Sequence, residues 1–249
     1  MTMIRRALAL GLAVSLAAAP VFAQEKTGNK PGFTLPPGSA RIVLMRPSIK
    51  VGAQSTGGMF EPNADWTDQA RENLGRALAQ AQGKLGNTVA DYVEPAGDAV
   101  RQTAEYRALF SAVADSVIAY QFFKGNRLPT KKREGSFEWG IGRDVAALPG
   151  LEGADYALFI TTEDQYGSTG RKLLQFAAAG LLGAGVSSGV HKGYAGLIDL
   201  KTGDLVWLNA DLKMGGDVRS PEGAQKRVGQ LLEGFPGAPL AVVPAIAGK

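Results

Sequence analysis

Residues 154–162 read Ala-Asp-Tyr-Ala-Leu-Phe-Ile-Thr-Thr, a short apolar run rich in β-forming residues. A glycine precedes it and the acidic pair Glu163–Asp164 follows it, which is the pattern of a buried strand. Residues 193–209 read Gly-Tyr-Ala-Gly-Leu-Ile-Asp-Leu-Lys-Thr-Gly-Asp-Leu-Val-Trp-Leu-Asn, two apolar runs joined at Lys201-Thr202-Gly203. Gly203 can take the positive φ that a tight hairpin turn requires. We therefore expect three strands at the centre of a sheet.

The hairpin is expected to span residues 193–212. Successive side chains of a strand point to opposite faces of the sheet, so alternate apolar residues share one face. The residues expected on that shared face are Ile198, Leu200, Val206, Leu208 and Leu212.

Three segments have apolar residues at helical spacing. The first follows a cap at Asn63 or Asp65, carries Ala70, Leu74, Leu78, Ala81 and Leu85, and stops at Gly86-Asn87. The second spans residues 98–123, with an expected apolar stripe of Tyr106, Leu109, Phe110, Val113, Val117 and Tyr120. The third begins with Ser220 as its cap and Pro221 at the first helical position, and carries Ala224, Val228, Leu231, Leu232 and Phe235.

The remaining elements are short. Residues 41–45 predict the first strand, which Ile49 and Val51 extend beyond Pro47, and residues 88–93 predict an edge strand. Residues 137–142 are expected to be a short strand or a loop packed on the core, followed by a helical turn or two over residues 143–148. The order of elements predicts a single α/β (α+β) domain at residues 40–236, with a mixed sheet that includes a C-terminal hairpin and helices packed against it.

The N-terminus has the pattern of an export signal. Arg5 and Arg6 precede an apolar run at residues 7–18, and Val21-Phe22-Ala23 places small residues where a signal peptidase cleaves. We expect residues 1–23 to be a signal peptide removed after Ala23, because the apolar run is short for an uncleaved membrane anchor. A flexible linker at residues 24–39 is expected to follow, and residues 237–249 are expected to form a flexible tail. The predicted location is the periplasm, or outside the cell.

Composition excludes several classes of function. The chain has no cysteine, which rules out disulfides and a lipid attached to an N-terminal cysteine. The signal carries two of the 27 basic residues and none of the 23 acidic ones, so the rest has a formal charge of 27 − 2 − 23 = +2. This near-neutral charge gives no reason to expect a nucleic-acid partner.

The sequence predicts no catalytic, cofactor or metal residues. His191 is the only histidine, so any Ser–His or Cys–His mechanism would depend on it, and it is expected to be a solvated loop residue. One histidine without cysteine does not support ordinary zinc or copper sites. The glycines at residues 180–193 do not form a dinucleotide-binding or phosphate-binding motif.

Two charged groups have alternative interpretations. Glu138 and the pair Glu163–Asp164 could act as the carboxylates of a periplasmic hydrolase, although ordinary surface charge is the preferred reading. Lys131-Lys132-Arg133 is expected to lie in a solvated loop, with binding as the alternative. Of the aromatic residues that could form a binding surface, Trp139 and Trp207 are expected in the core instead.

Residues 173–190 are uncharged and rich in glycine and alanine. Small residues recur there at four-residue spacing, which allows close packing of a helix on a neighbour in a soluble protein. The same spacing serves helix association in lipid, so a membrane-inserting segment or a hairpin contributed to a shared pore is the alternative. The length is marginal for a span.

At residues 153–160 and 197–207 the chain resembles a group of bacterial envelope proteins that includes the curli-secretion channel protein, the TolB N-terminal domain and outer-membrane activators of peptidoglycan synthases. In that group a strand of the Ala-Asp-Tyr kind precedes a hairpin that turns at an Asp-x-x-Thr-Gly motif, present here as Asp199 to Gly203. The resemblance covers residues 41–235 in element order. It implies a mixed α/β domain that binds partners and does not catalyse, and it carries over no functional residues. Many of the group are lipoproteins, and this chain lacks the cysteine that they use.

The expected function is therefore that of an exported, non-catalytic cell-envelope protein that binds a partner protein at the periplasm or outer membrane, without a cofactor. A membrane-assembly or pore-forming subunit that uses residues 173–190 and a periplasmic hydrolase with a carboxylate pair are the alternatives. The sequence does not predict an oligomeric state.

Overall fold

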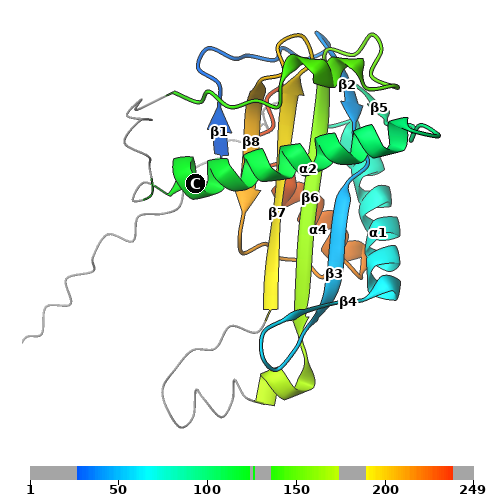
Figure 1. Cartoon of the computed structure of the whole chain (residues 1–249), viewed down its shortest axis with the longest axis vertical. Coiled ribbons are helices and arrows are strands. Elements are labelled where there is room, and N and C mark those ends of the chain that lie inside the picture. Colours follow the sequence, from blue (N-terminus) through cyan, green and yellow to red (C-terminus); the bar gives the residue numbers. More distant parts are fainter. Residues whose placement is uncertain (1–26, 124–125, 127–135, 174–188, 238–249) are drawn as a thin grey trace, which may run out of the picture.

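The structure is a computed structural model, and it describes residues 27–123, 126, 136–173 and 189–237. In these residues a mixed sheet forms the middle layer of one α/β domain, and helices cover both of its faces (Figure 1). The fold class predicted from the sequence is confirmed, including the hairpin near the C-terminal end of the chain.

Eight strands of the described chain make one sheet, in the order β1-β8-β7-β6-β2-β5, with β3 beside β6 and β4 beside β3. Their bounds are β1 (Thr27–Asn29), β2 (Arg41–Leu44), β3 (Ser48–Gln54), β4 (Phe60–Pro62), β5 (Thr88–Asp91), β6 (Tyr156–Gly167), β7 (Gly189–Asp199) and β8 (Leu205–Asp211). The expected edge position of residues 88–91 is confirmed, because β5 pairs with β2 at the end of this order.

The central strand is β6. It pairs with antiparallel β7 at residues 156–166, and on its other side it pairs in parallel with β2 at residues 156–158 and with β3 at residues 161–167. β2 and β3 therefore pair with successive parts of the same edge of β6. Pro47 lies between them and has no N–H to give to the ladder, so the interruption falls at the proline.

The helices are α1 (Ala64–Gln82), α2 (Ala99–Val117) with a π-helical extension at Ile118–Phe122, a 3₁₀ turn at Arg143–Ala147, and α4 (Pro221–Leu231). Two predicted caps are confirmed: Asn63 Oδ1 accepts the N–H of Trp66 at 2.9 Å, and Ser220 Oγ accepts the N–H of Gly223 at 3.1 Å. Each cap satisfies a backbone donor that the first turn of a helix leaves free.

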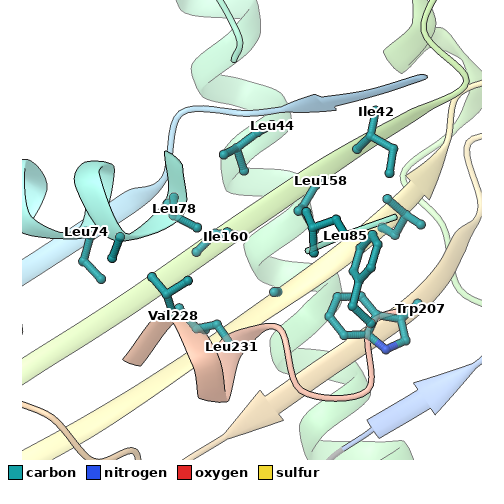
Figure 2. Packing of buried hydrophobic residues seen from close by; sticks show 14 of the residues in the cluster. Ile42, Leu44, Leu74, Leu78, Leu85, Leu158, Ile160, Trp207, Val228 and Leu231 are labelled. Atoms are coloured by element: carbon teal, nitrogen blue, oxygen red, sulfur yellow. The ribbon is translucent and has the colours of Figure 1, made fainter. Parts of the chain in front are cut away.

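Both faces of the sheet are buried. On one face Leu74 and Leu78 of α1 lie near Val228 and Leu231 of α4, and Trp207 belongs to the same cluster farther along the sheet, as Figure 2 shows. On the other face α2 lies across β6 and β7 (Figure 1), and its Phe110 ring stacks on Phe159 with a centroid distance of 4.8 Å. Each large apolar side chain buried in this way stabilises the fold by about 1.5–3 kcal/mol.

The turn of the hairpin is built from the side chains of the Asp-x-x-Thr-Gly motif. Asp199 Oδ1 accepts the backbone N–H of Lys201 at 2.8 Å and that of Thr202 at 3.2 Å. Gly203 has a φ of +77°, as the sequence predicts, and donates its N–H to the carbonyl of Asp199 at 2.7 Å. The carboxylate and the glycine together set the chain reversal.

The prediction that five apolar residues of the hairpin share one face of the sheet is partly wrong. Ile198, Leu200 and Leu208 pack on the α2 side with Leu212 against them, but Val206 packs on the α1/α4 side. The pairing of β7 with β8 shifts at Leu197/Ile198, so the strict alternation on which the prediction relied is broken there.

Several boundaries differ from the prediction. Residues 27–39 of the expected linker contribute β1, which pairs with β8, and the buried Leu35. The helix predicted to reach Gly86-Asn87 ends at Gln82, because Lys84 and Leu85 donate to the carbonyls of Ala81 and Gln82 in tighter turns. β6 continues past the expected boundary at Glu163–Asp164 to Gly167.

Other predictions lie outside the described residues. They are the signal peptide at 1–23, the basic run at 131–133, most of the uncharged run at 173–190 and nearly all of the tail at 237–249. In the portion that the structure describes, none of the helices is long and apolar enough to span a bilayer.

Candidate functional site

Asp164 is a buried carboxylate in the middle of the domain. It lies in β6 and has no exposed side-chain surface, so its predicted place on the surface is wrong. Successive residues of a strand face opposite sides, and Glu163 faces away from α4 to pair with Lys192 at 3.3 Å. A buried charge needs a partner, and Asp164 has one on α4.

Arg227 of α4 is that partner and is also fully buried. Its guanidinium binds Asp164 through two nitrogens, with N–O distances of 2.8 and 2.7 Å. The same group donates to Thr162 Oγ at 2.6 Å and to the carbonyls of Gly215 and Gly216 at 3.1 and 3.2 Å. All five N–H donors of the arginine therefore have acceptors, which ties α4 to β6 and to the loop after β8.

His191 lies against this ion pair. It belongs to β7 and its side chain is 30% exposed, so the prediction of a solvated loop histidine is wrong. Its Nδ1 lies 2.7 Å from Asp164 Oδ1, and because a carboxylate accepts, Nδ1 carries the proton of this bond. We call Thr162, Asp164, His191 and Arg227 the Asp164 cluster.

A row of aromatic rings in edge-to-face contact leads from the Asp164 cluster to the surface. The ring of Tyr166 meets that of His191 edge to face at 5.0 Å and that of Trp66 at 5.9 Å. The guanidinium of Arg219 lies 3.6 Å from the centroid of the Tyr166 ring, a cation–π contact. The Tyr166 hydroxyl donates to Asp217 at 2.7 Å, which fixes the ring against the loop before α4.

The two ends of the Tyr166–Asp217 hydrogen bond have shifted pKa values. Burial raises the pKa of Tyr166 well above its ordinary value, and the bond to Asp217 adds to this. Hydrogen bonds from the Arg219 guanidinium hold the pKa of Asp217 far below its ordinary value, desolvation opposes this, and the Tyr166 hydroxyl lowers it further. The folded protein therefore favours ionised Asp217 and neutral Tyr166.

The lowered pKa of Asp217 predicts that the stability of the protein decreases at low pH. Because the folded state holds this proton less readily than the unfolded chain, the contribution of Asp217 is full above about pH 4 and is lost as pH falls. Between neutral pH and a pH of about 2.5, the free energy of unfolding is expected to fall less in Asp217→Asn than in the wild type. Urea unfolding at the two pH values measures both decreases. Glu72→Gln, which changes another ion-paired surface carboxylate, is the control. Equal losses in wild type and Asp217→Asn would contradict the prediction.

The carboxylates proposed for a hydrolase do not lie together. Glu138 precedes the bridge between Gly140 and Asp204 at the turn end of the hairpin, and Glu163 is paired near the other end of β6. Among the residues that the structure describes, no group of three or more His, Cys, Asp or Glu side chains could hold a metal ion. The contacts of Asp164 with Thr162, His191 and Arg227 join β6 to β7 and α4.

The sequence patterns did not reveal this cluster, because its members come from three separate elements. The expected core position of Trp207 is confirmed, and Trp139 packs partly buried against the α2-side core.

A different kind of site lies on α2. Leu109 in α2, Tyr120 in the π-helical extension and Phe123 just after it are 42%, 42% and 39% exposed, and we call them the α2 apolar strip. Leu109 and Tyr120 were predicted to face the core. The rest of the predicted stripe is confirmed: Phe110 and Val117 are buried, with Ala114 beside them, and Tyr106 and Val113 pack partly buried against the same core. Large apolar side chains exposed at several positions of one helix can contribute to a surface that contacts another molecule.

No protein-family model matches this sequence, and no curated protein matches it. Among solved structures, the PelC dodecamer from Paraburkholderia phytofirmans is similar at 14% identity with a TM-score of 0.34, over 86% of this chain and 100% of that chain. Lipoprotein GNA1162 from Neisseria meningitidis is similar at 13% identity with a TM-score of 0.27, over 69% and 80%. Neither is one of the groups named from the sequence, so that resemblance is not confirmed for those groups, and TM-scores this low assign no function.

Proposed function

We propose that this chain is an exported, non-catalytic envelope protein whose α/β domain binds a partner protein through the α2 apolar strip. The exposure of Leu109, Tyr120 and Phe123 is the observation that carries this proposal. The aromatic members matter most, because tyrosine is enriched among the residues that dominate binding energy at protein interfaces. The signal-like N-terminus at residues 1–23 supports an envelope location.

The polar groups of the domain interior support binding over catalysis. In the Asp164 cluster the carboxylate, the guanidinium and the threonine hydroxyl are bonded to one another. A general base must reach a substrate proton, whereas Asp164 has no exposed surface. His191 is held by the same carboxylate, and we assign it to the stability of the β6–β7 pair.

Capture of partners from an envelope extract tests the proposal. The double variant Leu109→Asp/Tyr120→Asp is expected to retain at least tenfold less of the captured partner than the wild type, because burying two new carboxylates at an interface costs well over about 1.4 kcal/mol. The matched control is Gln102→Asp/Ala104→Asp, which adds the same charge at exposed positions of the same helix. Equal capture by the two double variants, or no envelope protein retained by the wild type, would remove the α2 apolar strip as the binding surface.

A second candidate function is contact with a membrane at the end of the sheet where the β3–β4 turn lies. Met59 in the β3–β4 turn is 74% exposed and Leu173 is 70% exposed. Arg171 donates to the carbonyl of Thr56 at 3.4 Å, so the two segments lie against each other there (Figure 1). Most of residues 173–190, the segment proposed to insert, lies outside the described residues, which stop at 173 and resume at 189.

Flotation with phosphatidylethanolamine/phosphatidylglycerol vesicles tests this second candidate. The wild-type protein is expected to float and Met59→Asp/Leu173→Asp is expected to remain at the bottom, because the apolar side chains that enter the lipid interface are replaced by charges. Val93→Asp, at a 78% exposed position next to β5, serves as the control and is expected to float. A wild-type protein that stays at the bottom ends this candidate without affecting the first.

A further inference from the structure

A groove of about 350 Å³ lies between α1 and α4, on the face of the domain opposite α2, and we call it the α1/α4 groove. Its size falls within the range of about 300–1,000 Å³ that is typical of ligand sites in proteins. The residues that line it come from the C-terminal half of α1, the turn after α1, and α4 with the residue that follows it. They are Ala77, Gln80, Ala81, Lys84, Leu85, Gln225, Val228, Gly229 and Leu232.

The two helices run in the same direction along the groove. Asn73 of α1 donates to the carbonyl of Val218, which precedes α4, at 3.3 Å. Farther along both segments, Gln225 Nε2 of α4 donates to Gln80 Oε1 of α1 at 3.2 Å. The groove therefore opens at the end where both helices have finished, beyond Gln82 of α1 and Leu231 of α4.

Small residues make room between the helices. Ala77 and Ala81 are one helical turn apart on α1, and Gly229 borders the groove from α4, where a Cβ would meet no atom within 4 Å. Leu85 and Val228 are buried and form part of the floor. Apolar surface that leaves water gains about 25 cal/mol per Å², so this floor suits a hydrocarbon chain.

One charged side chain, Lys84, belongs to the described lining of the groove. It lies in the turn after α1, where its backbone N–H donates to the carbonyl of Ala81 at 2.9 Å. Its ammonium group has no hydrogen bond or ion pair with the residues that the structure describes. A single cation beside an apolar floor complements a ligand that carries one negative charge at the end of an apolar chain. The second charge of a phosphate monoester would remain unmatched.

We propose that the α1/α4 groove binds a fatty acid, with its carboxylate beside Lys84 and its hydrocarbon chain between the helices. The chain lies along Ala81 and Val228 toward the contact between Gln80 and Gln225. The carboxylate stays at the open end, where water still reaches it, so no charge has to be buried. This site is separate from the proposed function, because the α2 apolar strip lies on the opposite face of the sheet.

Equilibrium dialysis of the purified protein with radiolabelled dodecanoate tests the place of the hydrocarbon chain. The wild type is expected to show saturable binding of one molecule per chain. Gly229→Leu is expected to weaken this binding by about tenfold or more, because the new side chain fills the groove. Gly75→Leu is the matched control: this α1 glycine also has open space around its Cβ but does not line the groove, so binding is expected to be unchanged.

A second pair of variants tests the place of the carboxylate. Lys84→Gln is expected to weaken dodecanoate binding by about threefold, the size of effect that an ion pair exposed to water gives. The same variant is expected to bind dodecanol as the wild type does, because dodecanol carries no charge for Lys84 to pair with. Lys226→Gln, at an exposed position of α4 outside the lining, is the control and is expected to leave dodecanoate binding unchanged.

Four results would overturn the proposal. They are a wild type without saturable binding, equal binding by the two leucine variants, a Lys84→Gln variant that binds dodecanoate as tightly as the wild type, and one that loses dodecanol to the same extent as dodecanoate. The double variant Leu109→Asp/Tyr120→Asp is expected to bind dodecanoate normally, and a loss there would instead place the acid on the α2 apolar strip. Partner capture is measured without fatty acid, so failure of this proposal and failure of the proposed function are distinguishable.

Discussion

Arg227→Met is expected to lower the free energy of unfolding by about 3–5 kcal/mol, a large part of the about 5–15 kcal/mol available to a domain. The substitution keeps most of the side-chain volume but removes the charge that compensates Asp164. Asp164 would then remain buried with only Thr162 and His191 as partners. The carbonyls of Gly215 and Gly216 would also lose their donor. Urea unfolding followed by circular dichroism measures the change.

Two further variants separate the effect of the unpaired buried charge from the other effects of replacing an α4 side chain with methionine. Lys226→Met, the same type of change at the exposed neighbouring residue of α4, is expected to alter stability by no more than about 0.5 kcal/mol. The double variant Arg227→Met/Asp164→Leu is expected to be more stable than Arg227→Met alone, because no unpaired charge remains buried. A loss below about 1 kcal/mol in Arg227→Met would show that Asp164 finds other compensation.

The sequence predicts the elements whose signals are local. The caps at Asn63 and Ser220 and the turn at Gly203 each depend on a few adjacent residues, and all three are confirmed. The position of Val206 was wrong because alternation along a strand assumes regular pairing, and the shift at Leu197/Ile198 depends on two strands together. β1 was missed because Thr27–Asn29 has no apolar pattern and owes its conformation to pairing with β8.

The Asp164 cluster could not be predicted for a related reason. Asp164 and Arg227 are 63 residues apart, and each looks like an ordinary surface charge in its own segment. The pairing is set when β6 and α4 meet across the sheet, which no local pattern encodes. The arginine position offered one usable signal: it lies next to Val228 and three residues after Ala224, on the apolar side of a helix. A charged residue on such a face indicates a buried partner.

Gly203→Ala is expected to lower the free energy of unfolding by about 2–5 kcal/mol. Two costs add: an alanine at a φ of +77° is strained by about 1–2 kcal/mol, and a crowded Cβ costs about 1–3 kcal/mol. The crowding comes from the segment that crosses the turn, because the Cβ would overlap the backbone of Gly142 and lie 2.5 Å from the amide nitrogen of Arg143. That contact also carries the hydrogen bond from Ile141 N–H to the Gly203 carbonyl at 2.9 Å.

Gly32→Ala measures the cost of backbone strain alone. Gly32 has nearly the same φ, +75°, but a Cβ there would meet nothing within 4 Å, so only the backbone strain of about 1–2 kcal/mol is expected. The difference between the two variants in urea unfolding then measures how firmly residues 140–143 are packed on the hairpin turn. If the two variants lose equal stability, the segment yields to the added methyl group and the turn is held by Asp199 alone. A larger loss at Gly203 means that the turn and the segment over it form one rigid unit, on which the ends of β7 and β8 depend.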